Sequence, residues 1–175
     1  SYYLASMDDP EKLYQIKARE FIPILDTAQG SEIFMPTLLD LLSHRALEFF
    51  SNEPIALTHS LEEFQPDHPD FFSPANSFIK VNLDKIQGTG FKKLALQIYR
   101  QLAALHLTYQ EFPPLIYNDL ERIEFVYQNT GLSDKDSLYL QSLINLKNVY
   151  SENPHSTLVD HRLALWYYDK DELLK

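Results

Sequence analysis

Three side chains that could bind a metal or relay a proton lie four residues apart: Asp40, His44 and Glu48. At about 100° per residue, positions i, i+4 and i+8 share one face of a helix. Di-iron helical bundles use such carboxylates and histidines, but they also need a Glu-x-x-His motif on each of two helices. The one match, Glu152 to His155, contains a proline. We therefore expect a solvated face with weak charge pairs, and we assign no metal and no cofactor.

Residues 85–109 form a basic strip, with four Lys or Arg side chains, one His and no acid, in a chain of net charge −10. A Gly-Thr-Gly turn precedes Lys92 and Lys93. Backbone amides at the N-terminus of a helix favour an anion, but neither the dinucleotide pattern nor the P-loop pattern is complete. Two interpretations stay open: the lysines bind a phosphate group, or, the one we favour, they are solvated beside a capped helix.

Within this strip Arg100 precedes His106 by six positions. The pair resembles the catalytic signature of HEPN-type ribonucleases, which are small and all-α. The resemblance covers seven to ten residues of 175, and it implies that the two side chains, joined across a dimer, activate a 2′-hydroxyl attack on RNA. On a straight helix this spacing leaves them roughly 120° apart, so they converge only if the helix bends or a partner subunit supplies one. Lys92, Lys93, Arg100 and His106 are thus the site residues of an alternative, RNA- or nucleotide-binding function.

Aromatic residues are more numerous than a helical core of this size requires, with eleven Tyr, eleven Phe and one Trp. The last predicted helix carries two apolar stripes, formed by Leu158, Leu165 and Tyr168 and by Val159, Leu163 and Trp166. A helix apolar on two sides is either deeply buried or shared with a partner, and Tyr and Trp are favoured anchors at interfaces. We predict a partner-binding surface at Trp166, Tyr167 and Tyr168, with Phe71 and Phe72 of an aromatic, acidic loop as its second part.

Composition limits the classes of function. With 45% hydrophobic residues the chain is globular rather than disordered. The lack of cysteine excludes disulfides, thiolate nucleophiles and zinc–thiolate sites, and no Gly-x-Ser-x-Gly elbow occurs. Net charge is −9 over residues 1–78, +4 over 79–110 and −5 over 111–175. Only the middle third would attract an anion, so general binding of nucleic acid is disfavoured.

No targeting or membrane segment is predicted. The first residues lack a basic n-region and a long apolar h-region. The longest apolar runs, such as 163–168, are far shorter than the ~18 residues of a spanning helix. We expect no membrane association and a cytoplasmic protein.

The helices that position these residues are predicted from caps and apolar periodicity. The first begins with Asp9 as N-cap and runs to about residue 29, with Pro23 kinking or dividing it; the second begins at Ser31 and ends near residue 50. A proline-rich loop follows over 51–78, with one short helix capped by Ser60 and Glu63. We expect this loop to be ordered, because Phe64, Phe71 and Phe72 favour burial. Over 78–86 a short strand and a helical turn are equally compatible with the pattern.

The C-terminal half is predicted as four helices. An apolar stripe defines one over about 91–109, and Phe112-Pro113-Pro114 stops it. The others span about 115–130, 133–150 and 157 to near residue 175, and a capping box of Ser133 and Asp136 begins the third.

These elements predict an all-α fold, a compact, irregular bundle of about five to seven helices in one domain over 1–175. The leading hypothesis for function is a non-catalytic adaptor or regulatory module that binds another protein or a second copy of itself. No catalytic residue is assigned.

Overall fold

Helices make up nearly all the regular structure of the protein. The computed structural model describes residues 5–21, 30–51 and 64–173. Within them lie the α-helices α2 (Pro10–Gln15), α3 (Leu38–Phe50), α5 (Ala75–Phe78), α6 (Phe91–Tyr109), α7 (Phe112–Asn129), α8 (Lys135–Val149) and α9 (Thr157–Leu173). Short 3-10 turns lie at Ala18–Glu20, Ser31–Ile33, Pro69–Phe72, Leu83–Lys85 and Pro154–Ser156. No strand occurs in these ranges, so the all-α prediction is confirmed.

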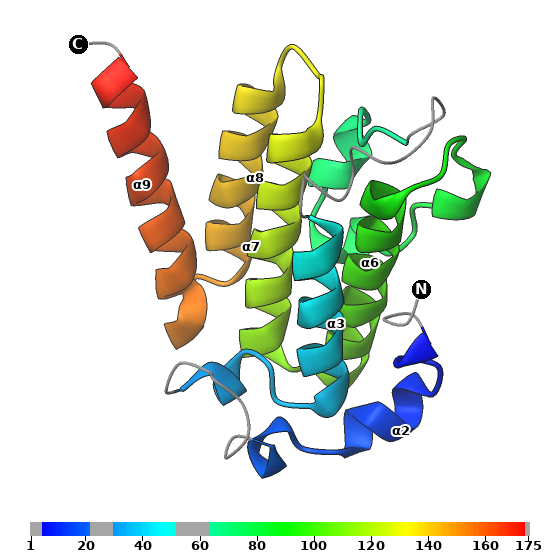
Figure 1. Ribbon diagram of the computed structural model, residues 1–175. Helices are drawn as coiled ribbons and strands as arrows, with labels where there is room; N and C mark the ends of the chain where they lie inside the picture. Colours follow the sequence, from blue (N-terminus) through cyan, green and yellow to red (C-terminus); the bar gives the residue numbers. More distant parts are fainter. Residues whose placement is uncertain (1–4, 22–29, 52–63, 174–175) are drawn as a thin grey trace.

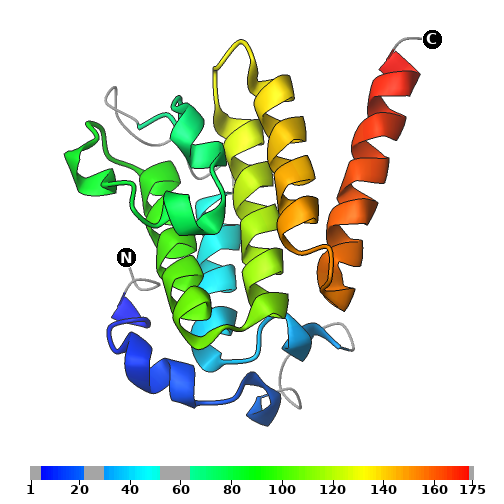
Figure 2. The same ribbon diagram turned by 180° about the vertical axis from the view of Figure 1, so that it is seen from behind.

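Helices α3, α6, α7 and α8 stand side by side as the centre of the bundle, and α9 forms one edge (Figure 1). Helix α2 crosses the end of the bundle where α3 begins, and the view from behind shows α5 and the 3-10 turn Leu83–Lys85 beside α6 (Figure 2). The main core cluster draws on all the long helices and on the segment that contains Phe64, Phe71 and Phe78. None of the described helices combines the length and the apolar character needed to cross a membrane.

Helix α6 has the bounds that its apolar stripe predicts. Ala95, Ile98 and Leu102 recur at helical spacing and are buried. The helix ends where Gln110 takes a left-handed conformation, with φ of 57°. The prolines that follow were expected to stop α6 and instead lie in the first turn of α7, where a missing N–H costs no hydrogen bond.

The N-terminal prediction was wrong in its boundaries. Helix α2 ends at Gln15 because Ile16 is extended, and the Ile16 carbonyl accepts from the amide of Leu38 (2.8 Å). The next residues form an isolated antiparallel bridge, Lys17 with Thr37. Thr37, rather than Ser31, caps α3, through a capping box with Asp40. Pro23 lies outside the described residues.

The segment before α6 is ordered where it is described. Phe64, Phe71 and Phe72 are buried, as the proline-rich loop was expected to require. The capping pair Ser60 and Glu63 lies outside the described residues. Residues 78–86 form no strand: they comprise the end of α5, a connecting turn and a 3-10 turn.

The two C-terminal helices lie close to their predicted ranges. Helix α8 begins without the expected capping box, because Asp136 instead binds Tyr127 and Lys170. Helix α9 begins at Thr157 as predicted.

Candidate functional site

Helix α9 is fixed to the bundle by one of its two apolar stripes. Val159 and Leu163 are buried, and the Trp166 ring lies 4.9 Å from the ring of Tyr139 and 5.4 Å from that of Tyr127. The ammonium group of Lys170 covers the outer face of the indole at 4.4 Å. Trp166, predicted as a partner anchor, is therefore a contact between α9 and its own bundle.

Three ion pairs reinforce this face of α9. Arg162 donates to Glu124 (2.8 Å) and to Glu121 (3.3 Å) of α7. Lys170 donates to Asp136 of α8 (2.5 Å), and this hydrogen bond is the main reason that the pKa of Asp136 is lowered. Charged groups on three helices thus hold α9 in one orientation.

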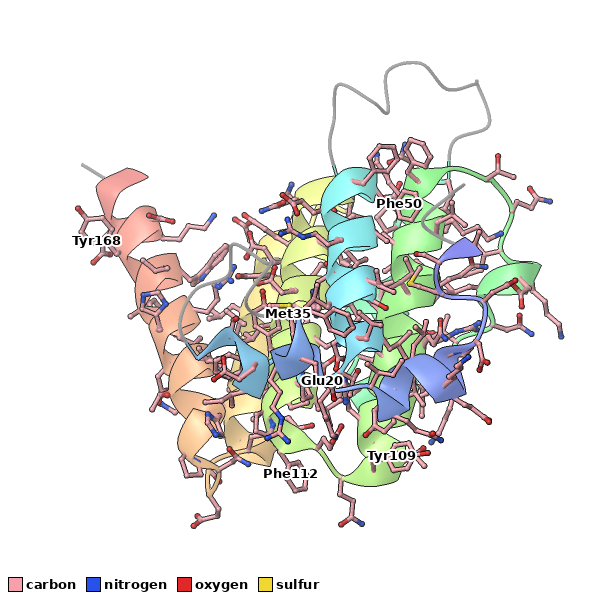
Figure 3. All side chains as sticks on the ribbon, turned by 60° about the horizontal axis from the view of Figure 1, so that its bottom comes forward. Glu20, Met35, Phe50, Tyr109, Phe112 and Tyr168 are labelled. Atoms are coloured by element: carbon pink, nitrogen blue, oxygen red, sulfur yellow. The ribbon has the colours of Figure 1, made fainter. Side chains whose placement is uncertain are left out.

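The other stripe of α9 is exposed beyond Leu158, which packs against the core. Leu165 is 44% exposed and Tyr168 is 65% exposed, three positions apart on one face of the helix. Tyr167, at 54%, lies at the edge of this face. Figure 3 shows Tyr168 on the side of α9 that is turned away from the other helices. We call Leu165, Tyr167 and Tyr168 the α9 outer surface.

The charges beside the α9 outer surface are acidic. Asp169 and Asp171 are exposed and form no ion pair with the residues that the structure describes. Asp160, one turn before Leu165, is paired with Lys147 at 2.5 Å. An apolar surface flanked by free carboxylates is complementary to an apolar surface flanked by Lys or Arg.

Phe71 and Phe72, the second part of the predicted surface, lie in the core. They are 1% and 4% exposed, and the ring of Phe71 packs against that of Phe64 at 5.9 Å. The structure does not bring them together with α9 on an accessible face. Both rings are buried in the core, as was also expected for them, and this burial explains why the segment contains them.

Lys92 and Lys93 of the basic strip are engaged with uncharged oxygens. Lys92 donates to the side chain of Gln65 (2.8 Å). Lys93 donates to the carbonyls of Ile86 (2.6 Å) and Gly88 (3.1 Å), which fixes the turn before α6. The alternative phosphate-binding function stays a prediction. In the structure its two lysines bond to the segment that precedes α6.

Arg100 and His106 are not brought together. Arg100 donates to the carbonyl of Val81 (2.9 Å), whereas His106 is 1% exposed and contacts α3. Helix α6 is continuous between them, so the two side chains keep the separation that a straight helix imposes.

His106 belongs instead to a buried polar network. Its Nε2 lies 2.9 Å from Asp40 Oδ1, and its Nδ1 lies 3.2 Å from Glu111 Oε2. Both contacts are hydrogen bonds when the ring carries a proton on each nitrogen. The Tyr14 hydroxyl donates to Glu111 (2.5 Å), so the network joins α2, α3 and α6. Sequence reasoning missed Glu111 and Tyr14 because no local pattern connects them to His106.

Asp40, His44 and Glu48 do not together form the solvated face that was expected. Asp40 is 1% exposed and accepts from both the amide and the hydroxyl of Thr37. Glu48 is exposed and pairs with Arg45 at 3.1 Å. His44 packs its ring against Tyr117 of α7, with 5.1 Å between ring centroids. Within the described ranges, no group of three or more His, Cys, Asp or Glu side chains could hold a metal ion.

A cavity of about 720 Å³ lies between α3 and α7, and we call it the α3–α7 cavity. His44, Tyr117 and Glu121 line it. Burial lowers the pKa of His44 to about 4 and raises the pKa of Tyr117 and of Glu121 above their ordinary values. Sequence reasoning missed Tyr117 and Glu121, although their i, i+4 spacing places them on one face of a predicted helix.

The α9 outer surface and the α3–α7 cavity are therefore two candidate sites among the described residues. One is a convex apolar surface and the other a polar, aromatic cavity. Comparison of the chain with models of protein families, with curated proteins and with solved structures gave no match.

Proposed function

We propose that this chain is a non-catalytic protein-interaction module and that the α9 outer surface binds its partner. The observation that carries the proposal is the exposure of Leu165, Tyr167 and Tyr168 on a helix whose opposite stripe is already buried. Adaptor and regulatory proteins present such rigid, exposed aromatic side chains as anchors.

Three features support this surface rather than other exposed apolar residues. Three of the seven exposed large hydrophobic residues of the described chain lie within four positions of α9. The anchored stripe, with Trp166 at its centre, gives the surface a rigid support. A rigid surface loses less conformational entropy when it binds than a mobile one.

The partner that fits best is an amphipathic helix with Lys or Arg beside its apolar stripe. A helical stripe is complementary to another helical stripe, and the free carboxylates of Asp169 and Asp171 favour cations beside it. A second copy of this chain fits less well, because each copy carries a net charge of −10. We place the module in the cytoplasm, since a chain without cysteine needs no oxidising compartment.

The test is a calorimetric titration with a designed amphipathic peptide of leucine and lysine as the probe. We expect saturable binding with a dissociation constant of about 10–100 µM. The double substitution Leu165→Ser and Tyr168→Ser should weaken binding at least about tenfold, since both anchors are lost. It leaves the net charge unchanged, so a purely electrostatic attraction would survive it.

The matched control is Val149→Ser on α8, because Val149 is 63% exposed and far from the α9 outer surface in sequence. We expect this variant to bind within about twofold of the unmodified chain. Equal weakening by both variants, or none by either, would contradict the proposal.

A further inference from the structure

The α3–α7 cavity has the size of a small-molecule site. Its volume of about 720 Å³ lies within the range of about 300–1,000 Å³ that is usual for ligand pockets. Its walls come from four segments: residues 30–35, α3, α6 and α7. Met35, labelled in Figure 3, and the rings of Phe34, Tyr99, Tyr117 and Phe125 supply apolar surface. Walls of this kind enclose the body of an apolar or aromatic ligand.

Two side chains in the cavity, His44 and Glu121, can each accept a further hydrogen bond. No hydrogen bond joins the ring nitrogens of His44 to any residue of the described ranges. With a pKa of about 4 the ring is neutral near pH 7, so one nitrogen is an acceptor. Glu121 accepts one hydrogen bond through Oε1, from Arg162 at 3.3 Å, and Oε2 accepts none from the described chain. Tyr117 is one turn from Glu121 on α7, and its ring contacts the His44 ring.

The cationic and amide donors nearby are already engaged. Arg162 is shared between Glu121 and Glu124, and Gln128 donates to Glu124 (2.7 Å). Arg45 donates to Glu48 (3.1 Å). The lining carries three carboxylates, Glu48, Glu121 and Glu124, against the single cation Arg45. A ligand that fits therefore donates hydrogen bonds and carries positive charge, and an anionic ligand would meet repulsion.

We propose that the α3–α7 cavity binds an organic ammonium ion with an apolar or aromatic body, whose charged group donates to Glu121 and His44. The aromatic walls add cation–π attraction for the same charge. A bare metal ion fits poorly, because the described residues offer no group of three metal-binding side chains. This site is separate from the α9 outer surface, and it extends the function beyond protein binding.

The test is a titration of the unmodified protein followed by two-dimensional amide NMR, with 2-phenylethylammonium as the probe. We expect saturable shifts centred on His44 and Tyr117, with a dissociation constant of about 1 mM or below. The uncharged 2-phenylethanol and the anionic phenylacetate have nearly the same shape, and each should bind at least about tenfold more weakly because the carboxylate favours the ammonium charge.

The substitution Glu121→Gln should weaken binding of 2-phenylethylammonium at least about tenfold, since it removes the charge and keeps the shape. Glu152→Gln, at an exposed position outside the cavity, is the matched control and should change nothing. Any of three results would overturn the proposal. The first is the absence of saturable shifts up to about 10 mM 2-phenylethylammonium. The others are equal binding of the alcohol or the acid, and unchanged binding of 2-phenylethylammonium by a folded Glu121→Gln protein. If Glu121→Gln does not fold, the comparison of the three probes on the unmodified chain decides.

Discussion

Two buried polar clusters join parts of the chain that are far apart in sequence. Asp40 contacts His106 across 66 positions, and both side chains are 1% exposed. Arg122 pairs with Asp119 and also donates to the carbonyls of Phe71 and Ser73. A buried charge is stable only with its partners in place, so these residues tie the polar interior to one arrangement of the helices.

The substitution His106→Ala should lower the free energy of unfolding by about 3–5 kcal/mol, because it leaves Oδ1 of the buried Asp40 carboxylate without a partner, while Oδ2 keeps its bonds to Thr37. Chemical denaturation measures this loss. His161→Ala, at an exposed position of α9, should stay within about 0.5 kcal/mol of the unmodified protein. A cost below about 1 kcal/mol for His106→Ala would show that the network is not a stabilising one.

Stability should also depend on pH through His44. Its pKa in the folded state is about 4, against 6.5 for the free side chain, because burial disfavours the charged ring. The unfolded chain therefore takes up a proton first as the pH falls. Stability is fully retained above pH 6.5 and is lost as the pH falls toward 4, by at most about 3 kcal/mol.

The measurement for His44 is the free energy of unfolding of the unmodified chain and of His44→Gln from pH 7.5 to 4.5. All other titrating groups are common to both proteins. The free energy of unfolding of the unmodified chain, minus that of His44→Gln, should therefore decrease as the pH falls. Parallel curves over this range would be the contrary result.

The two faces of α9 should respond differently to truncation. Trp166→Ala removes the contact with Tyr127 and Tyr139 and should cost about 2–4 kcal/mol. Tyr168→Ala removes an exposed ring and should cost less than about 0.5 kcal/mol. Hydrogen exchange across α9 reports the difference: its amides should exchange faster in Trp166→Ala alone. Equal effects would mean that the inner stripe does not anchor the helix.

The turn before α6 depends on a glycine. Gly88 has φ of +93°, and a Cβ there would lie 2.8 Å from Phe64 Cα. Gly30 has φ of +87° with nothing within 4 Å of its Cβ position, so it is a matched control for backbone strain alone. We expect Gly30→Ala to cost about 1 kcal/mol and Gly88→Ala clearly more, measured by thermal unfolding. The reverse order would contradict the packing of this turn.

Elements defined by local periodicity were predictable, and those defined by distant contacts were not. The bounds of α6 follow from its own apolar stripe. The first helix ends early because Ile16 and Ala18 bond to residues near position 37, which no local pattern reveals. On α9 both stripes were visible in the sequence. Which of them faces the bundle depends on Tyr127 and Tyr139. For the same reason the sequence did not reveal the partners of His106 or the fact that His44 and Glu121 line one cavity.

At the scale of the whole molecule, charge separates the two functional hypotheses. The chain carries a net charge of −10, and within its one basic segment Lys93 and Arg100 are bonded to backbone carbonyls. Binding of RNA or nucleotide would have to displace these bonds, whereas a basic partner helix meets carboxylates that are already free beside the α9 outer surface. This charge distribution supports the proposed cationic protein partner rather than the alternative of a nucleic acid.

Site-specific photo-crosslinking in the cells that make this protein tests the partner surface most directly. With benzoylphenylalanine in place of Tyr168, we predict one discrete crosslinked product whose attached segment is an amphipathic, basic helix of another protein. Adding Leu165→Ser should abolish it, since the second anchor is lost. Three results would contradict the proposed surface: no crosslinked product from position 168, a product in which the partner is a second copy of the chain, or the same product when the photoreactive residue replaces Val149.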